Sequence, residues 1–226
     1  MSLGANANIN VAGRNVAFFD ETRGTAGGTV ALIAVVGIAY AATLVLAVQG
    51  TLPLLPATVV LAVLTYVAYT PLHEAAHGNI HGERTGLAWL NALCGHVAAQ
   101  FILVPYVTHR VEHFAHHRYT NQPGLDPDHV ISGMSGGPLA FVKAVIGFLW
   151  SQWTFLFRDY WATAPAREKV TFLAEVILAL GWRAALLAVL PWSAWLLLVP
   201  LAWFGGALFT AYWFAYRPHH PYDETA

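Results

Sequence analysis

Long stretches without a charged side chain constrain this chain more than any other feature. Residues 28–50 are 23 consecutive positions without a charge, and residues 54–71 are another 18. An α-helix needs about 20 predominantly apolar residues to cross the hydrocarbon core of a bilayer. Two more apolar stretches, 170–190 and 192–214, are separated by a single proline. We therefore predict an all-α membrane protein with four transmembrane helices arranged as two hairpins.

Composition supports this prediction and excludes several classes of protein. Of the 226 residues, 57% are apolar and 10% are charged, whereas a soluble domain is about one quarter charged. There are 11 Lys and Arg against 12 Asp and Glu, which leaves no basic surface for nucleic acid. The single cysteine, Cys94, excludes a disulfide scaffold and a thiolate zinc site. We divide the chain into a polar N-terminal segment, 1–27, without a signal-peptide pattern, and one membrane domain, 28–226.

The histidines form clusters with the spacing of metal ligands. Nine of the 11 lie in three clusters: His73, His77 and His81; His109, His113, His116 and His117; and His219 and His220. Residues three or four apart share a face of a helix, and imidazole suits zinc, copper, iron and nickel. Nine imidazoles are too many for one zinc ion and about right for two metal ions. The expected ligands are His73, His77, His113, His116 and His117.

Other polar residues near these clusters are weaker candidates for the site. Four histidines are expected either to bind metal or to orient a ligand through the free ring N–H: His81, His109, His219 and His220. Glu74 and Glu112 stand beside expected ligands and either accept such an N–H bond or lie on a solvated helix face. Asn121, Asp126 and Asp128 are expected to order the loop that follows the second cluster.

The two larger clusters share a site only if they lie on the same side of the membrane. The apolar stretch 87–106 between them contains Asn91, His96 and Gln100, so we predict an interfacial or re-entrant helix rather than a further span. We predict the same for 141–157, which is bounded by charged residues. Because neither hairpin turn contains Lys or Arg, the positive-inside rule puts both termini and the histidines in the cytoplasm, at an inner or plasma membrane. The four spans then carry a cytoplasmic, histidine-rich metal-binding cap.

Two pairs of residues inside the predicted spans are unusual. Glu175 and Arg183 are ionisable, which is costly within a membrane, so we expect pairing or placement at the interface rather than catalysis. Gly205 and Gly206 are adjacent in the last span, where glycine pairs usually serve close helix packing.

The histidine pattern resembles that of the membrane fatty acid desaturase superfamily, which includes acyl-lipid desaturases and carotenoid ketolases and hydroxylases. The first box of that superfamily is HxxxH, often followed by Gly, as in His73-EAA-His77-Gly78. The second is HxxHH, often continued as HHRxTN, as in His113-FA-His116-His117-RYT-Asn121, and a D-P-D element like Asp126-Pro127-Asp128 often follows. The order of hairpin, two boxes, hairpin and tail also agrees, so the resemblance covers about residues 30–226.

The third HxxHH box of that superfamily has no match in this chain. The resemblance therefore implies one of two cases. Either the chain is truncated before the third box, or the pair His219–His220 corresponds to a lone histidine that some members supply from the end of the last span.

The resemblance implies a di-iron centre that uses O2 to remove hydrogen from an unactivated C–H bond. Desaturation of a fatty acyl chain is the preferred activity, because HHRYTN followed by DPD is most similar to acyl desaturases. Hydroxylation or ketolation of a carotenoid or another apolar lipid is the alternative. The sequence has no dinucleotide-binding motif, cysteine cluster or haem motif. Electrons are therefore expected from a ferredoxin, rubredoxin or cytochrome, and the lipid substrate from the bilayer.

Two rival functions remain. His73-Glu74-xx-His77 is also the HExxH signature of zinc metalloproteases, with Glu74 as general base and Asp126 as an available third ligand. That function would leave the other histidines unexplained. A metal-binding or transport protein without catalysis predicts polar residues along a path through the spans, and the spans contain few.

Overall fold

The computed structural model describes residues 24–222, and its regular structure in that range is all helical, without a strand. The helices are α1 (Gly27–Val48), α2 (Leu54–Val67), α3 (Tyr69–His77), α4 (Ala88–Ile102), α5 (Tyr106–Tyr119), α6 (Pro138–Phe155), α7 (Ala166–Val189), α8 (Trp192–Leu196) and α9 (Ala202–Thr210). Short helical segments are η1 (Thr85–Leu87), η2 (His129–Gly136), η3 (Leu156–Tyr160), η4 (Leu197–Leu201) and η5 (Ala211–Tyr216). Residues 1–23 of the predicted N-terminal segment lie outside the described residues.

Five helical stretches in the described part of the chain are long and apolar enough to cross a membrane. They are Gly27–Val48, Leu54–His77, Pro138–Tyr160, Ala166–Val189 and Trp192–Tyr216. Four of them correspond to the predicted spans, with ends that differ by a few residues. The fifth contains the stretch 141–157, which we predicted to be interfacial. It is long enough to cross a membrane because α6 continues into η3, which gives a helix of 23 residues. How many of the five cross the bilayer stays a prediction.

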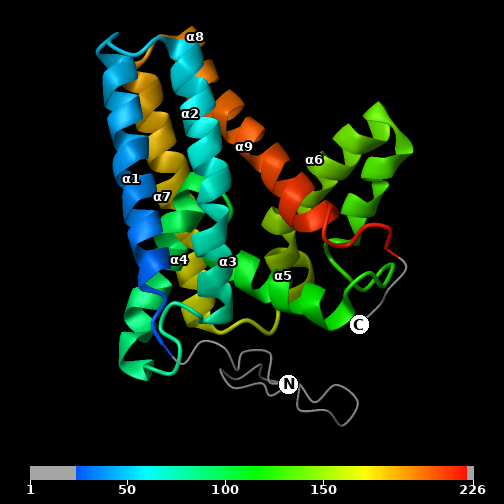
Figure 1. Cartoon of the computed structure of the whole chain (residues 1–226). Coiled ribbons are helices and arrows are strands. Elements are labelled where there is room, and N and C mark those ends of the chain that lie inside the picture. Colours follow the sequence, from blue (N-terminus) through cyan, green and yellow to red (C-terminus); the bar gives the residue numbers. More distant parts are fainter. Residues whose placement is uncertain (1–23, 223–226) are drawn as a thin grey trace.

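The helix that we predicted over 87–106 is α4, which is followed by a sharp bend. α4 ends at Ile102, because Leu103 adopts a left-handed backbone with φ 58° and Pro105 cannot continue a helix. α5 then begins at Tyr106, and the two helices meet at 96°. α5 therefore lies crosswise beside α3, near the lower ends of the upright helices, instead of running parallel to them (Figure 1).

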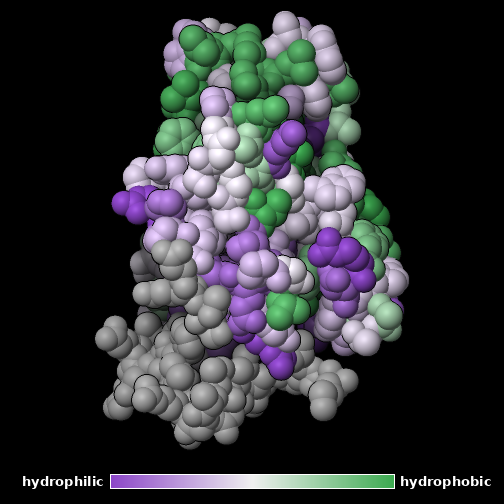
Figure 2. Space-filling model, turned by 90° about the vertical axis from the view of Figure 1, so that its right-hand side faces the viewer, coloured by the Kyte–Doolittle hydropathy of each residue, from purple (hydrophilic) through white to green (hydrophobic). Residues whose placement is uncertain are grey.

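The upright helices pack into a bundle with an apolar exterior. α1, α2, α7 and α9 form its body, while α6 stands beside it and packs on η2 and α5 (Figure 1). Large apolar side chains on the outside are exposed, such as Ile38 at 72% and Ile177 at 71%, as expected of helices that contact lipid. On the face drawn in Figure 2, hydrophobic residues gather at the top and hydrophilic ones lower down. The helices and this polarity indicate an integral membrane protein.

Candidate metal centre

The first histidine cluster lies at the end of the second long helix. α2 passes into α3 with no more than a local irregularity at Ala68, and the whole stretch Leu54–His77 counts as one helix. Gly78, with φ +79°, ends α3 directly after His77. A left-handed residue at this position is the usual helix terminator, and glycine adopts it without strain. His73 and His77 therefore occupy the last turns of α3 and share one face.

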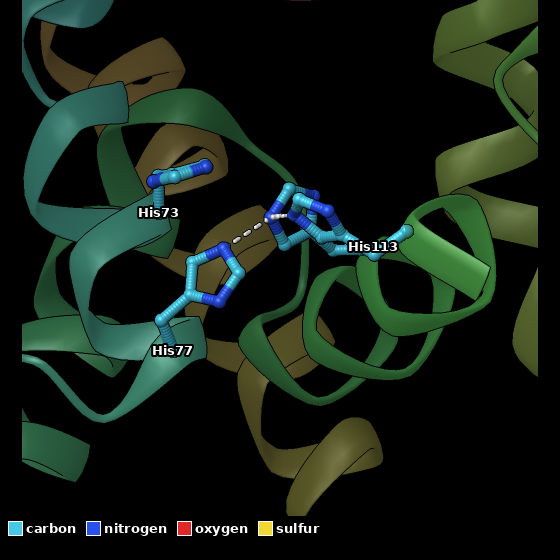
Figure 3. A group of neighbouring side chains, drawn as sticks. His73, His77 and His113 are labelled. Carbon is cyan, nitrogen blue, oxygen red and sulfur yellow. Dashed lines mark hydrogen bonds between the residues drawn. The ribbon is translucent and has the colours of Figure 1, made fainter. Parts of the chain in front are cut away.

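Four histidines from α3 and α5 converge on one point. Ligand nitrogens of His73, His77, His113 and His117 all lie within 4.8 Å of one another. The Nε2 atoms of His77 and His113 are 2.8 Å apart, and those of His113 and His117 are 3.0 Å apart. Figure 3 shows His73 and His77 on α3 pointing toward His113 on α5. We call these four residues the four-histidine group.

This geometry fits a metal ion. Four nitrogens bound at about 2.0–2.1 Å in a tetrahedron would lie about 3.3 Å apart. The two Nε2 distances in the four-histidine group, 2.8 and 3.0 Å, are close to that value. Each imidazole nitrogen supplies either a proton or a lone pair, so the Nε2 of His113 cannot donate to both neighbours at once. A shared cation accepts a lone pair from every nitrogen, and the group is therefore suited to hold one.

His116 turns away from the four-histidine group and meets the third cluster. Its Nε2 atom lies 3.2 Å from Nε2 of His219, and its Nδ1 donates to Asp126 Oδ1 at 2.8 Å. Asp128 lies 3.8 Å from the same Nδ1. Burial raises the pKa of Asp128 to about 7. Burial and the nearby His116 lower the pKa of His219. We call His116 and His219 the second histidine pair.

One cavity joins the two groups. It has a volume of about 230 Å³ and is lined by His73, His113 and His117 on one side and by His116, His219 and Asp128 on the other. Tyr69 forms part of its wall and also lines a smaller apolar cavity of about 20 Å³. The smaller cavity lies between α3, α6 and α9.

Polar side chains on neighbouring helices hold the histidines of α5. His109 is buried, stacks on His113 with ring centroids 5.3 Å apart, and donates from Nδ1 to Gln152 Oε1 at 3.3 Å. Glu112 is 0% exposed and accepts a bond from Ser151 Oγ at 2.6 Å. A solvated helix face, one of our two expectations for Glu112, is therefore wrong.

The remaining predicted residues have lesser places. His81 donates from Nδ1 to the carbonyl of Gly82 at 2.6 Å and is outside the four-histidine group. His220 is exposed and contacts Tyr216 rather than the second histidine pair. Oε1 of Glu74 lies 3.4 Å from Nδ1 of His73, which agrees with the expected bond to a neighbouring ligand.

The loop after α5 has a role that the sequence reasoning missed. Asp126 was expected to order this loop, or to be a third zinc ligand in a protease, and it does accept bonds from the backbone N–H groups of Asn121 at 2.8 Å and Asp128 at 2.9 Å. The same carboxylate also binds His116, which fixes the orientation and tautomer of that imidazole. The sequence did contain a signal for this role, because two carboxylates, Asp126 and Asp128, lie in a turn directly after the second histidine cluster.

Comparison with known proteins finds similarity to fatty acid desaturases. The profile described as fatty acid desaturase matches residues 49–226. The Delta(12) fatty acid desaturase fat-2 of Caenorhabditis elegans is 41% identical over 49 residues. That match covers 22% of this chain and 13% of the length of the nematode protein. No solved structure matches this chain.

Proposed function

Because this chain belongs to the fatty acid desaturase family, we propose that it desaturates a fatty acyl chain of a membrane lipid. The reaction would use O2 and two electrons from a separate protein. The observation that carries the proposal is the convergence of His73, His77, His113 and His117, from the HxxxH and HxxHH boxes, within 4.8 Å. Family membership supports an oxidoreductase, and the histidines supply the donor set that iron accepts.

Two metal positions follow from the two groups of histidines. The four-histidine group would hold one iron, and the second histidine pair would contribute to holding the other. The cavity of about 230 Å³ lies between them. When bound, the irons would supply the activation of O2 and the removal of hydrogen from an unactivated C–H bond.

The chain itself would hold and orient these groups. Asp126 keeps the Nδ1 proton of His116 and leaves the Nε2 of that ring turned toward His219. Glu74 stands beside Nδ1 of His73 in the same way. Tyr69 separates the histidine cavity from the small apolar cavity, whose lining also includes Leu72, Phe148 and Leu149.

The stoichiometry requires an electron donor. One CH2–CH2 unit, one O2, two protons and two electrons give one CH=CH unit and two waters. The sequence has no motif for a bound nicotinamide, flavin, haem or iron–sulfur group. We therefore propose a ferredoxin, rubredoxin or cytochrome as the source, and a cytoplasmic position for the histidine centre.

The deciding experiment combines metal analysis with lipid analysis. Purified in detergent, the protein should hold about two iron ions per chain, since six imidazoles are arranged in two groups. His77→Ala should lose iron, and His81→Ala, which changes a histidine outside both groups, should keep it. The lipids of cells that produce the protein and a suitable electron donor should gain a double bond. A bound zinc ion without iron would refute the proposal.

Two other functions give different outcomes. Hydroxylation or ketolation of an apolar lipid would use the same centre and would appear as an oxygenated product. A zinc metalloprotease would need Glu74 as a base facing the metal, but Oε2 of Glu74 accepts a bond from Asn79 at 2.9 Å. Glu74→Gln should therefore leave a lipid product detectable, whereas it would abolish proteolysis.

A further inference from the structure

The N-terminus of α5 is held by a residue from a distant part of the chain. The first N–H groups of a helix have no partner within it, and the N-cap residue here, Pro105, offers no side-chain bond. The side chain of Glu175, on α7, accepts the first two of these N–H groups. Its Oε1 accepts the backbone N–H of Tyr106 at 2.9 Å, and its Oε2 accepts that of Val107 at 3.2 Å.

The same carboxylate also contacts α4. Nδ1 of His96 lies 2.8 Å from Oε1 of Glu175, and the Glu175 side chain is only 6% exposed. A buried carboxylate is costly unless it is fully bonded, and here three donors from two helices surround it. The positive end of the α5 dipole adds to this stabilisation, because it favours an anion at the first turn.

This contact matters because α5 carries histidines of both groups. α5 contributes His113 and His117 to the four-histidine group and His116 to the second histidine pair. The 96° bend leaves α5 with no straight continuation from α4 that could fix its direction. α7 carries no histidine, yet its Glu175 contacts both helices that meet at the bend, through His96 of α4 and the first N–H groups of α5.

We propose that Glu175 is a positioning residue for the metal centre: by capping α5 from α7, it sets the placement of the α5 histidines relative to His73 and His77. This inference rests on the proposed metal-binding function. It predicts that loss of the carboxylate loosens the first turn of α5 and weakens metal binding, although Glu175 touches no histidine of either group.

Arg183 provides a matched control. It lies on the same helix eight residues later, is 5% exposed, and donates from its guanidinium to the carbonyl of Gln100 at 2.7 Å. It therefore stabilises the end of α4 and not the start of α5. Glu175→Gln and Arg183→Gln each remove one buried charge from α7 and keep a polar side chain, which equals that of Glu in length and is shorter than that of Arg.

The experiment uses the full chain in detergent and has two readouts. The first is hydrogen exchange of peptides that contain Tyr106 and Val107. Glu175→Gln should speed their exchange roughly tenfold, as expected for loss of a bond to a charged group. The second is titration with Co²⁺, followed by its absorption spectrum. Cobalt affinity should fall about 10–100-fold, the usual effect of losing a residue that supports a ligand.

The outcomes separate this inference from the proposed function. Faster exchange and weaker cobalt binding in Glu175→Gln, with neither change in Arg183→Gln, support it. Unchanged values in Glu175→Gln, or equal changes in both variants, overturn it. If the unmodified protein binds no cobalt, the metal-binding function fails and the positioning role with it, whatever the exchange data give. If Glu175→Gln does not fold, His96→Ala replaces it and should give the same two changes in smaller measure.

Discussion

Replacing Gly206 with alanine should push α2 and α9 apart. A Cβ at this position would lie 2.6 Å from the backbone oxygen of Ala62 and 2.6 Å from Cβ of Thr65. Thr65 is 0% exposed, and a backbone oxygen cannot swing aside. Overpacking costs about 1–3 kcal/mol, while the change from glycine to alanine in a helix returns about 0.5–1 kcal/mol. The free energy of unfolding should therefore fall by about 0–2.5 kcal/mol, with a central value of about 1.3 kcal/mol.

Thermal unfolding in detergent measures this effect. For a chain of this size, 1 kcal/mol corresponds to about 2–4 °C, so Tm should fall by roughly 4 °C. Gly181→Ala is the matched control on α7, because a Cβ there meets nothing within 4 Å. Its Tm should rise by about 2 °C through helix propensity alone. A Tm at or above that of the unmodified protein for Gly206→Ala would refute the reasoning. An equal fall in Gly181→Ala would refute it as well.

Three further predictions concern the histidine centre. Asp126→Asn should weaken binding of iron about 10–100-fold, measured by competition with a chelator, because His116 loses its carboxylate partner; unchanged affinity would contradict this role. His219→Ala should lower the iron content and His220→Ala should not, since of these two histidines it is His219 that contacts His116. Equal iron contents in the two variants by elemental analysis would contradict an iron site at the second histidine pair. Removing metal with a chelator should lower Tm, because an ion that binds the folded state stabilises it, and readdition of iron should restore it.

Much of the fold follows from local sequence. The uncharged stretches predict the long helices, and Gly205 and Gly206 predict close packing, which Gly206 confirms by its contact with α2. The stretch 141–157 was harder to place, because its length depends on the continuation of α6 into η3. The bend before α5 was missed because a left-handed leucine at 103 has no sequence signature, although Pro105 marks a possible helix boundary.

The candidate site was predicted in composition but not in grouping. Spacing by four correctly pairs His73 with His77 and His113 with His117. This spacing does not by itself reveal that His116 lies outside the four-histidine group. Neighbouring residues on a helix point about 100° apart, so His116 faces a different direction from His117. That rotation turns His116 toward His219, a residue more than 100 positions away that we ranked as a weaker candidate.

Partners at long range were beyond the sequence altogether. Glu175 was expected to be paired or interfacial, and its pairing is confirmed, but its partners lie 68 to 79 positions earlier in the chain. Nothing local distinguishes it from Arg183, which is equally buried and bonds backbone carbonyls instead. Such contacts depend on how helices pack, and one sequence holds no record of that.

The crosswise helix α5 has a consequence for how such a centre can diverge among related proteins. α5 supplies histidines to both groups, whereas α3 serves only the four-histidine group and the segment after η5 serves only the second histidine pair. A substitution that rotates or shifts α5 alters both groups at once. Changes in α3 or in the tail alter one group and leave the other in place. Natural variation should therefore be tolerated less along α5 than in α3 or in the segment that carries His219.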